Sequence, residues 1–200
     1  MIRAAIVGVP ADQLDALRQD MATTYGSDRA LFMPFYGWAL WNASAGKDAA
    51  LDEVRALPLE DGFPGVLAKA MVLAADGRHD DALRFLKAAR YELSRQDAGA
   101  FPNEMLTAPY DFVLASWLMA RQTGERRYAE EGLAVARGYQ ATNEFMAWPH
   151  AAEALLSLDP KARQVAACRA ALLDPGSMFL HESGLKPDPA SAACRQATAW

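Results

Sequence analysis

The side chains that could bind a metal ion are few in this sequence and lie far apart. Only three histidines occur, His79, His150 and His181. His150 and Glu153 are three positions apart, so on a helix they would share a face and could bind a metal ion together. An ordinary, partly exposed polar pair is the preferred interpretation. We therefore predict no metal site.

Side chains for acid–base catalysis show no better organisation. Asp80 and Asp81 fall at a predicted helix start, where carboxylates complement the helix dipole. Two carboxylates act together in catalysis only if the fold brings them to one site. The adjacent positions of Glu130 and Glu131 in the sequence do not indicate such a site. The sequence has no GxSxG, HExxH, P-loop or GxGxxG motif. We therefore predict no catalytic residues and no cofactor.

The two cysteines, Cys168 and Cys194, both lie near the C-terminal end of the sequence. A disulfide between them would pin the tail to the last long helix. Two small, buried, reduced thiols are the alternative, because cytosolic proteins usually keep thiols reduced. A metal site is disfavoured, since there is no CxxC pair.

The clearest structural pattern lies in residues 65–93, GVLAKAMVLAADGRHDDALRFLKAARYEL. Apolar residues at steps of three and four predict two helices. The pattern breaks at Asp76 and Gly77, because aspartate favours turns and glycine accepts the left-handed conformation that ends helices. The predicted apolar faces comprise Val66, Leu67, Ala70, Met71, Leu73 and Ala74, then Ala82, Phe85, Leu86, Ala89 and Leu93.

The small residues in this stretch resemble the second-helix signature of the tetratricopeptide repeat. The signature is a turn glycine, an alanine five positions later and another alanine seven further on. It occurs at Gly77, Ala82 and Ala89, and again at Gly124, Ala129 and Ala136. The resemblance implies an all-α fold, in which antiparallel helix pairs stack as a short right-handed solenoid. A fragment of an (α/α) toroid is the rival architecture.

Four breaks, at Gly46, Gly77, Gly124 and Asp159, divide the chain into units. At the last break, Asp159 followed by Pro160 predicts the N-cap and the first-turn proline of a helix. Two of the three spacings are close to the family period of about 34 residues, and the third carries an insertion at 96–107. We predict one domain over 1–200. Its expected parts are a helical cap at 1–30, about four helix pairs at 31–175 and a capping tail at 176–200, with a last short helix from Pro189.

In such a stack the first helix of each pair lines the concave face. The resemblance therefore selects as partner-binding residues Tyr36, Leu40, Leu67, Met71, Asp111, Leu114, Leu118, Arg121, Gln122 and Trp148. An apolar groove with one arginine suits an extended or helical peptide. Each residue could instead pack between repeats, and we expect that for about half of them.

Aromatic residues crowd into one short segment: Phe32, Phe35, Tyr36, Trp38 and Trp41. At helical spacing they would cover two faces, more than one buried stripe requires. We expect the second face to be covered by the N-terminal helix; an exposed face would supply interface anchors.

Composition excludes several classes of protein. Apolar residues make up 52% and charged residues 22%, which is typical of a folded domain. The net charge of −5 argues against nucleic-acid binding, which needs a basic surface. No apolar run approaches the roughly 20 residues of a membrane helix. The short apolar run at the start is below a signal-peptide core, which favours the cytoplasm; a periplasmic protein, if this is a mature or excised fragment, is the alternative.

We therefore predict a scaffold or adaptor that binds a protein or peptide partner without catalysis. This prediction follows from fold-level analogy. The alternative is a toroid-type enzyme, or a non-catalytic fragment of one, that acts on a glycan or peptide. A third reading is a structural domain whose repeats serve self-association as a homo-oligomer.

Overall fold

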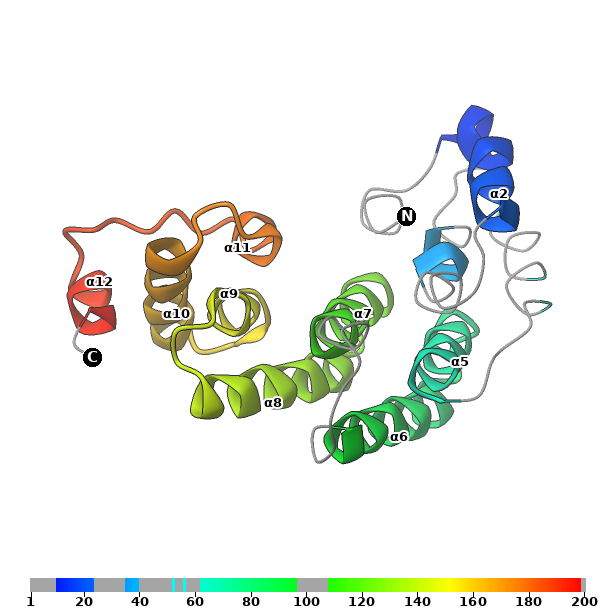
Figure 1. The fold of residues 1–200 in the computed structure, drawn as a ribbon, viewed down its shortest axis with the longest axis horizontal. Coiled ribbons are helices and arrows are strands. Elements are labelled where there is room, and N and C mark those ends of the chain that lie inside the picture. The colour runs from blue at the N-terminus through cyan, green and yellow to red at the C-terminus, as the bar shows by residue number, and fades with distance from the viewer. Residues whose placement is uncertain are drawn as a thin grey trace. The chain divides into compact units, whose positions relative to one another are not determined.

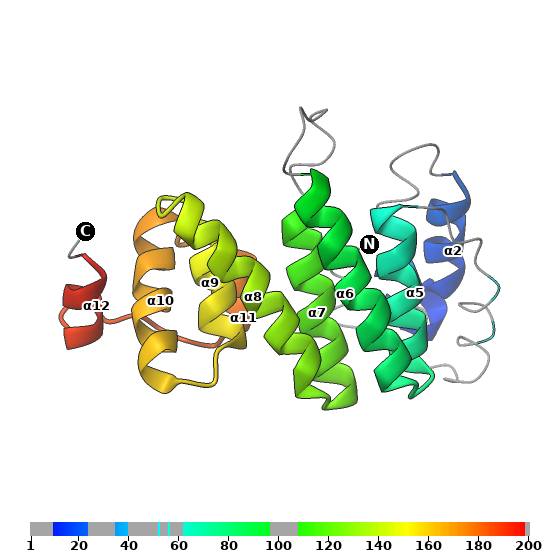
Figure 2. The same cartoon turned by 90° about the horizontal axis from the view of Figure 1, so that it is seen from below.

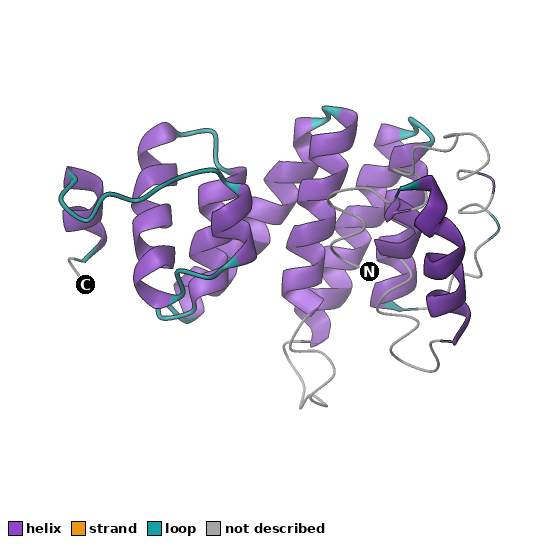
Figure 3. Cartoon of the chain, turned by 90° about the horizontal axis from the view of Figure 1, so that it is seen from above, coloured by secondary structure: helices purple, strands orange, loops and turns teal. Residues whose placement is uncertain are grey.

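The computed structural model describes residues 10–23, 35–39, 52, 56, 62–96 and 108–198. Within these ranges every regular element is a helix and none is a strand, which confirms the predicted all-α class (Figure 3). The labelled elements are η1 (Ala11–Gln13), α2 (Leu14–Thr23), α5 (Phe63–Ala75), α6 (His79–Gln96), α7 (Ala108–Thr123), α8 (Arg126–Thr142), α9 (Ala147–Leu156), α10 (Pro160–Leu173), α11 (Met178–Glu182) and α12 (Ala192–Ala197) (Figure 1). No helix in the described ranges is both long and apolar enough to cross a membrane.

The chain divides into two compact units. The first comprises Met1–Met105 and Leu118–Glu125, and the second comprises Leu106–Trp117 and Arg126–Trp200. The continuous helix α7 thus contributes residues to both. Each unit is described by itself below.

In the first unit, α5 and α6 form a packed helix pair (Figure 2). Helix α5 ends where the sequence predicts, because Gly77 adopts a φ of 74°. The amide of Gly77 donates to the carbonyl of Ala74 (3.0 Å), and that of Arg78 donates to the carbonyl of Leu73 (2.9 Å). These two bonds form a Schellman cap, which satisfies carbonyls at the helix end and turns the chain into α6.

Small residues allow this pair to pack closely. Ala82 and Ala89 of α6 are fully buried, as is Leu86 between them. Asp80 and Asp81 lie in the first turn of α6, as predicted. The turn at Gly77 and the buried alanines of α6 thus lie where the glycine–alanine spacing of this stretch places them.

The N-terminal part of the first unit also follows the sequence pattern. Leu14, Leu17 and Met21 of α2 are buried on one face, at spacings of three and four. In the aromatic segment Phe35, Tyr36 and Trp38 are buried. The remaining aromatic residues, Phe32 and Trp41, lie outside the described residues, as does Gly46. Of the predicted insertion at 96–107, Gln96 is the last residue of α6, and 97–107 lie outside the described residues.

In the second unit, α8, α9 and α10 pack in succession, with α9 in contact with both of its neighbours. Helix α10 begins as predicted, because Asp159 is its N-cap and Pro160 is its first residue. The Asp159 carboxylate accepts a hydrogen bond from the Lys161 amide at 2.9 Å. This bond satisfies one of the otherwise unpaired amides at the start of the helix.

The tail contains two short helices, where the sequence pattern predicts one. Helix α12 begins after Ser191, whose side chain accepts a hydrogen bond from the Cys194 amide. The additional helix, α11, packs on α9. Its five residues are too few for an apolar period to show in the sequence.

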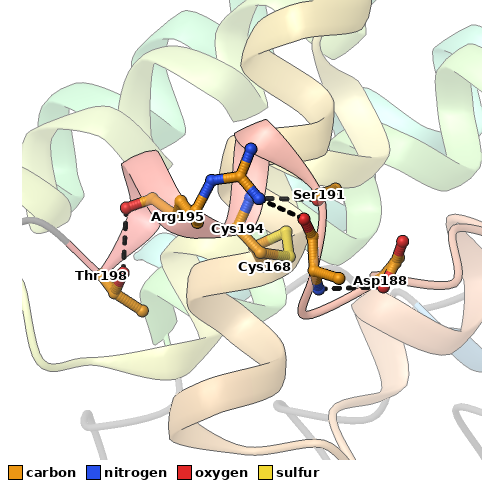
Figure 4. The surroundings of a disulfide bond; sticks show 7 residues. Cys168, Asp188, Ser191, Cys194, Arg195 and Thr198 are labelled. Atoms are coloured by element: carbon orange, nitrogen blue, oxygen red, sulfur yellow. Dashed lines mark hydrogen bonds between the residues drawn. A yellow bond between two sulfur atoms is a disulfide. The ribbon is translucent and has the colours of Figure 1, made fainter.

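A disulfide joins α10 to α12 (Figure 4). Cys168 and Cys194 are both buried, and Ala197, Val165 and Ala193 pack around them. The Arg195 guanidinium donates to the carbonyl of Ala190 just before α12. The disulfide thus fixes the tail to α10, the last long helix. Of the two states that the sequence allows for these cysteines, the structure has the disulfide and not the two reduced thiols.

Candidate functional site

The structure places most of the residues selected for a partner groove in the interior. Six are buried: Tyr36, Leu67, Met71, Asp111, Leu114 and Leu118. Arg121 is exposed and Gln122 and Trp148 are half-buried, whereas Leu40 lies outside the described residues. The buried side chains are not available to a partner in this structure, so a surface for binding has to be sought elsewhere.

Trp148 itself belongs to a cluster of aromatic rings within the second unit. Its ring lies 5.4 Å from that of Tyr139 and 6.1 Å from that of Tyr110, centroid to centroid, and Tyr110 lies 4.6 Å from Phe179. Burial, helped by the Asp111 carboxylate, raises the pKa of Tyr110 to about 12. Its hydroxyl therefore stays protonated. In this cluster, side chains of α7, α8, α9 and α11 pack against one another.

An accessible hollow lies on the α5–α6 pair, within the first unit. It has a volume of about 590 Å³. We call it the α5–α6 hollow, and its lining consists of Lys69, Leu73, Arg78, Asp81, Arg84, Phe85 and Ala88. Among the residues that the structure describes, this lining comes from α5, α6 and the turn between them.

Positive charge predominates in the α5–α6 hollow. Arg78 donates to the Asp81 carboxylate from Nε (3.0 Å) and from a terminal nitrogen (2.6 Å), and Arg84 pairs with its other oxygen. Hydrogen bonds from Arg78 and then Arg84 lower the pKa of Asp81, so this carboxylate stays ionised at neutral pH. With Lys69, three cations face one carboxylate, in a chain whose net charge is −5.

The floor of the α5–α6 hollow is apolar. Leu73 is buried, Phe85 is half-buried, and the Lys69 Nζ atom lies 4.6 Å from the centre of the Phe85 ring. This ammonium–ring contact holds the charge next to the apolar surface. The sequence analysis placed Phe85 on the predicted apolar face of this helix. The signal it missed is a second face of α6, on which Asp81, Arg84, Phe85 and Ala88 recur at steps of three and four.

A second hollow lies in the second unit, where α9, α10 and α12 meet. It has a volume of about 240 Å³. We call it the α9–α10 cavity, and its lining consists of His150, Glu153, Asp159, Lys161, Ala162, Val165, Ala166, Arg169 and Gln196. The predicted pair of His150 and Glu153 thus does face one space.

Most of the bonding capacity of Glu153 is already used. One oxygen accepts from Arg137 (2.8 and 2.9 Å) and the other accepts from the amide of Gln140 (3.0 Å). His150 donates through Nε2 to the carbonyl oxygen of Glu144 at 2.8 Å, because a carbonyl can only accept. No three histidine, cysteine, aspartate or glutamate side chains gather as metal ligands in the part of the chain that the structure describes.

Lowering the pH from about 7.5 to about 5.5 is expected to destabilise the fold through His150. Burial lowers the pKa of this imidazole below its ordinary 6.5, so near pH 6 the unfolded chain binds a proton that the folded chain does not. The contribution of the neutral ring to the free energy of unfolding is intact above pH 6.5. It is lost as the pH falls through 6.5 towards the pKa that His150 has in the folded chain. Urea unfolding midpoints at the two pH values measure the loss.

A His150→Gln variant provides the control for this prediction. Its amide nitrogen can still donate towards the Glu144 carbonyl, but the side chain does not titrate. The variant should lose less stability than the wild-type chain over the same pH interval. Equal losses would show that His150 does not contribute.

No family model matches the chain, and no curated protein or solved structure gives a significant match.

Proposed function

We propose that this protein is a non-catalytic interaction module that binds a peptide segment of a partner protein at the α5–α6 hollow. The proposal includes the tetratricopeptide-like stacking that the spacing of Gly77, Ala82 and Ala89 implies. The observation that carries it is the combination, on one helix pair, of an apolar floor with three cations and one carboxylate.

The lining also indicates the chemistry of the segment. Its apolar floor would take one large aliphatic or aromatic side chain, and burial of such a side chain contributes about 1.5–3 kcal/mol. The excess cations favour aspartate or glutamate on either side of that residue. Arginine presents a planar fork that matches a carboxylate, as Arg78 already does towards Asp81. We therefore expect a short acidic segment with one apolar anchor.

A hydrolase that acts on a glycan would need a different arrangement. Two carboxylates on either side of the bond are the usual requirement. Among the described residues that line the α5–α6 hollow there is one carboxylate, Asp81, and two arginines hold it. Binding is therefore the better interpretation of this surface.

Fluorescence anisotropy with labelled ten-residue peptides tests the proposal. One peptide carries a central phenylalanine among four glutamates, a second replaces the glutamates by lysines, and a third replaces the phenylalanine by serine. We expect saturable binding of the first and at least about ten-fold weaker binding of the other two. Equal binding of all three, or of none, would contradict the proposal.

Single charge reversals locate the binding surface. Lys69→Glu and Arg84→Glu should each weaken binding of the acidic peptide by about ten-fold, because they reverse a charge in the lining. Lys87→Glu is the matched control, since Lys87 is exposed on the same helix but is not part of the lining. If the control weakens binding as much as the other two, the assignment of the surface is wrong.

A further inference from the structure

The turn between α8 and α9 presents a large aromatic side chain at the surface. Phe145 is 65% exposed, and the exposed residue Glu144 precedes it. The Phe145 amide donates to the side-chain oxygen of Asn143 at 3.2 Å, and Nε2 of His150 donates to the Glu144 carbonyl at 2.8 Å. The fold therefore holds this turn in one conformation, so little further ordering opposes the binding of a partner.

The end of α10 adds to the same end of the helix pair. Leu172 is 57% exposed, and Asp174 is exposed at the C-cap of α10. Residues 157–159 alone join α9 to α10, so these contacting helices run antiparallel, side by side in Figure 2, and the start of α9 lies beside the end of α10. The electrostatic interaction of His150 with Arg169 agrees with this placement. We call the exposed group the Phe145 surface, and it consists of Glu144, Phe145, Leu172 and Asp174.

The Phe145 surface has the composition that the α5–α6 hollow requires of its ligand. The described lining of the hollow combines an apolar floor with three cations and one carboxylate. The Phe145 surface combines two exposed apolar side chains with two exposed carboxylates. Asp174 accepts a hydrogen bond from the Gly176 amide at 3.0 Å, which leaves its negative charge in place. An aromatic anchor next to charge of the opposite sign favours association of the two surfaces.

We propose that the partner bound at the α5–α6 hollow is a second copy of this chain, which inserts Phe145 of its own Phe145 surface. This inference rests on the proposed function and names the partner. The Phe145 ring lies on Leu73 and Phe85 of the first copy, and Glu144 meets the guanidinium of Arg84. The two surfaces differ and every chain carries both, so the contact is head-to-tail. A dimer leaves one surface of each kind unused, to which further copies can add.

Sedimentation velocity of the full chain tests self-association. The weight-average sedimentation coefficient should rise between about 10 μM and about 1 mM, the range in which a small interface associates. An excess of the peptide with one phenylalanine among glutamates should keep the chain monomeric, because it occupies the hollow. The lysine peptide should leave the association unchanged.

Three variants locate the contact. Phe145→Ser removes the anchor and Arg84→Glu reverses a charge in the hollow, so each should weaken self-association by about ten-fold or more. Leu158→Ser is the matched control. Leu158 is 63% exposed and also precedes a carboxylate, Asp159, but it lies at the opposite end of the α9–α10 pair. Phe145→Ser should bind the acidic peptide as the wild-type chain does, whereas Arg84→Glu should not.

A mixture of two variants tests the head-to-tail geometry. The Phe145→Ser chain keeps an intact hollow and the Arg84→Glu chain keeps an intact Phe145 surface. Equal amounts should therefore form a one-to-one dimer, although neither variant associates by itself. Urea unfolding verifies that each variant is folded.

The outcomes separate this inference from the proposed function. Binding of the acidic peptide by a chain that stays monomeric up to about 1 mM would overturn the inference and leave the proposed function standing. A peptide that does not bind would overturn both. Equal effects of Phe145→Ser and Leu158→Ser, or a mixture that forms no dimer, would also overturn the inference.

Discussion

Replacement of Gly132 by alanine is expected to lower the free energy of unfolding by about 1–3 kcal/mol, although alanine is the better helix former. A Cβ atom at this position would lie 2.9 Å from the Cβ of Ser116 and 3.1 Å from Cδ1 of Leu156. The Ser116 Cβ is attached directly to its backbone, and the Ser116 hydroxyl donates to the Phe112 carbonyl at 2.8 Å. This neighbour cannot rotate away, so a helix must shift.

Gly138 on the same helix provides the opposite case. A Cβ there would meet nothing within 4 Å, and the residue is exposed. Gly138→Ala should therefore raise the free energy of unfolding by up to about 1 kcal/mol, the difference in helix propensity. Urea denaturation of both variants measures the two effects. Similar stabilisation by both substitutions would show that α8 does not approach α7 and α9 as closely as the structure has it.

The contrast between Gly77 and Gly132 shows what the sequence could predict. Gly77 ends a helix, and the residues that require it are its immediate neighbours in the chain. Gly132 is required by Ser116 and Leu156, which come from other helices. The repeat signature selects Ala129 and Ala136 on this helix. Ala136 is indeed fully buried but Ala129 is only half-buried, and at Gly132 between them an added Cβ would come within 3.1 Å of two neighbouring helices.

The candidate sites were less predictable than the fold, for a related physical reason. An apolar helix face indicates burial but not which neighbour covers it, so residues such as Leu67 and Leu114 were selected for a groove and lie in the core. The α5–α6 hollow depends on Lys69 and Phe85, which are sixteen positions apart and meet only because the helices pair. Capping at Asp159, in contrast, depends on adjacent residues and was predicted correctly.

The disulfide is expected to make the largest single contribution to the stability of the second unit. Removing it with Cys168→Ser and Cys194→Ser should lower the free energy of unfolding by about 3.5 kcal/mol, the value that loop-closure entropy gives for a sequence separation of 26. Helix α12 has six residues, too few to form by itself, so it depends on α10 for its structure. The amides of residues 192–198 should therefore also lose protection from hydrogen exchange.

Reduction of the wild-type chain supplies the comparison for this prediction. Both sulfurs are buried among Ala197, Val165 and Ala193, so dithiothreitol should act slowly on the folded chain and quickly once urea unfolds it. The reduced wild-type chain and the double serine variant should then unfold at similar urea concentrations. If the double variant keeps both the wild-type midpoint and the protection of residues 192–198, packing on α10 alone holds α12 and the bond adds nothing.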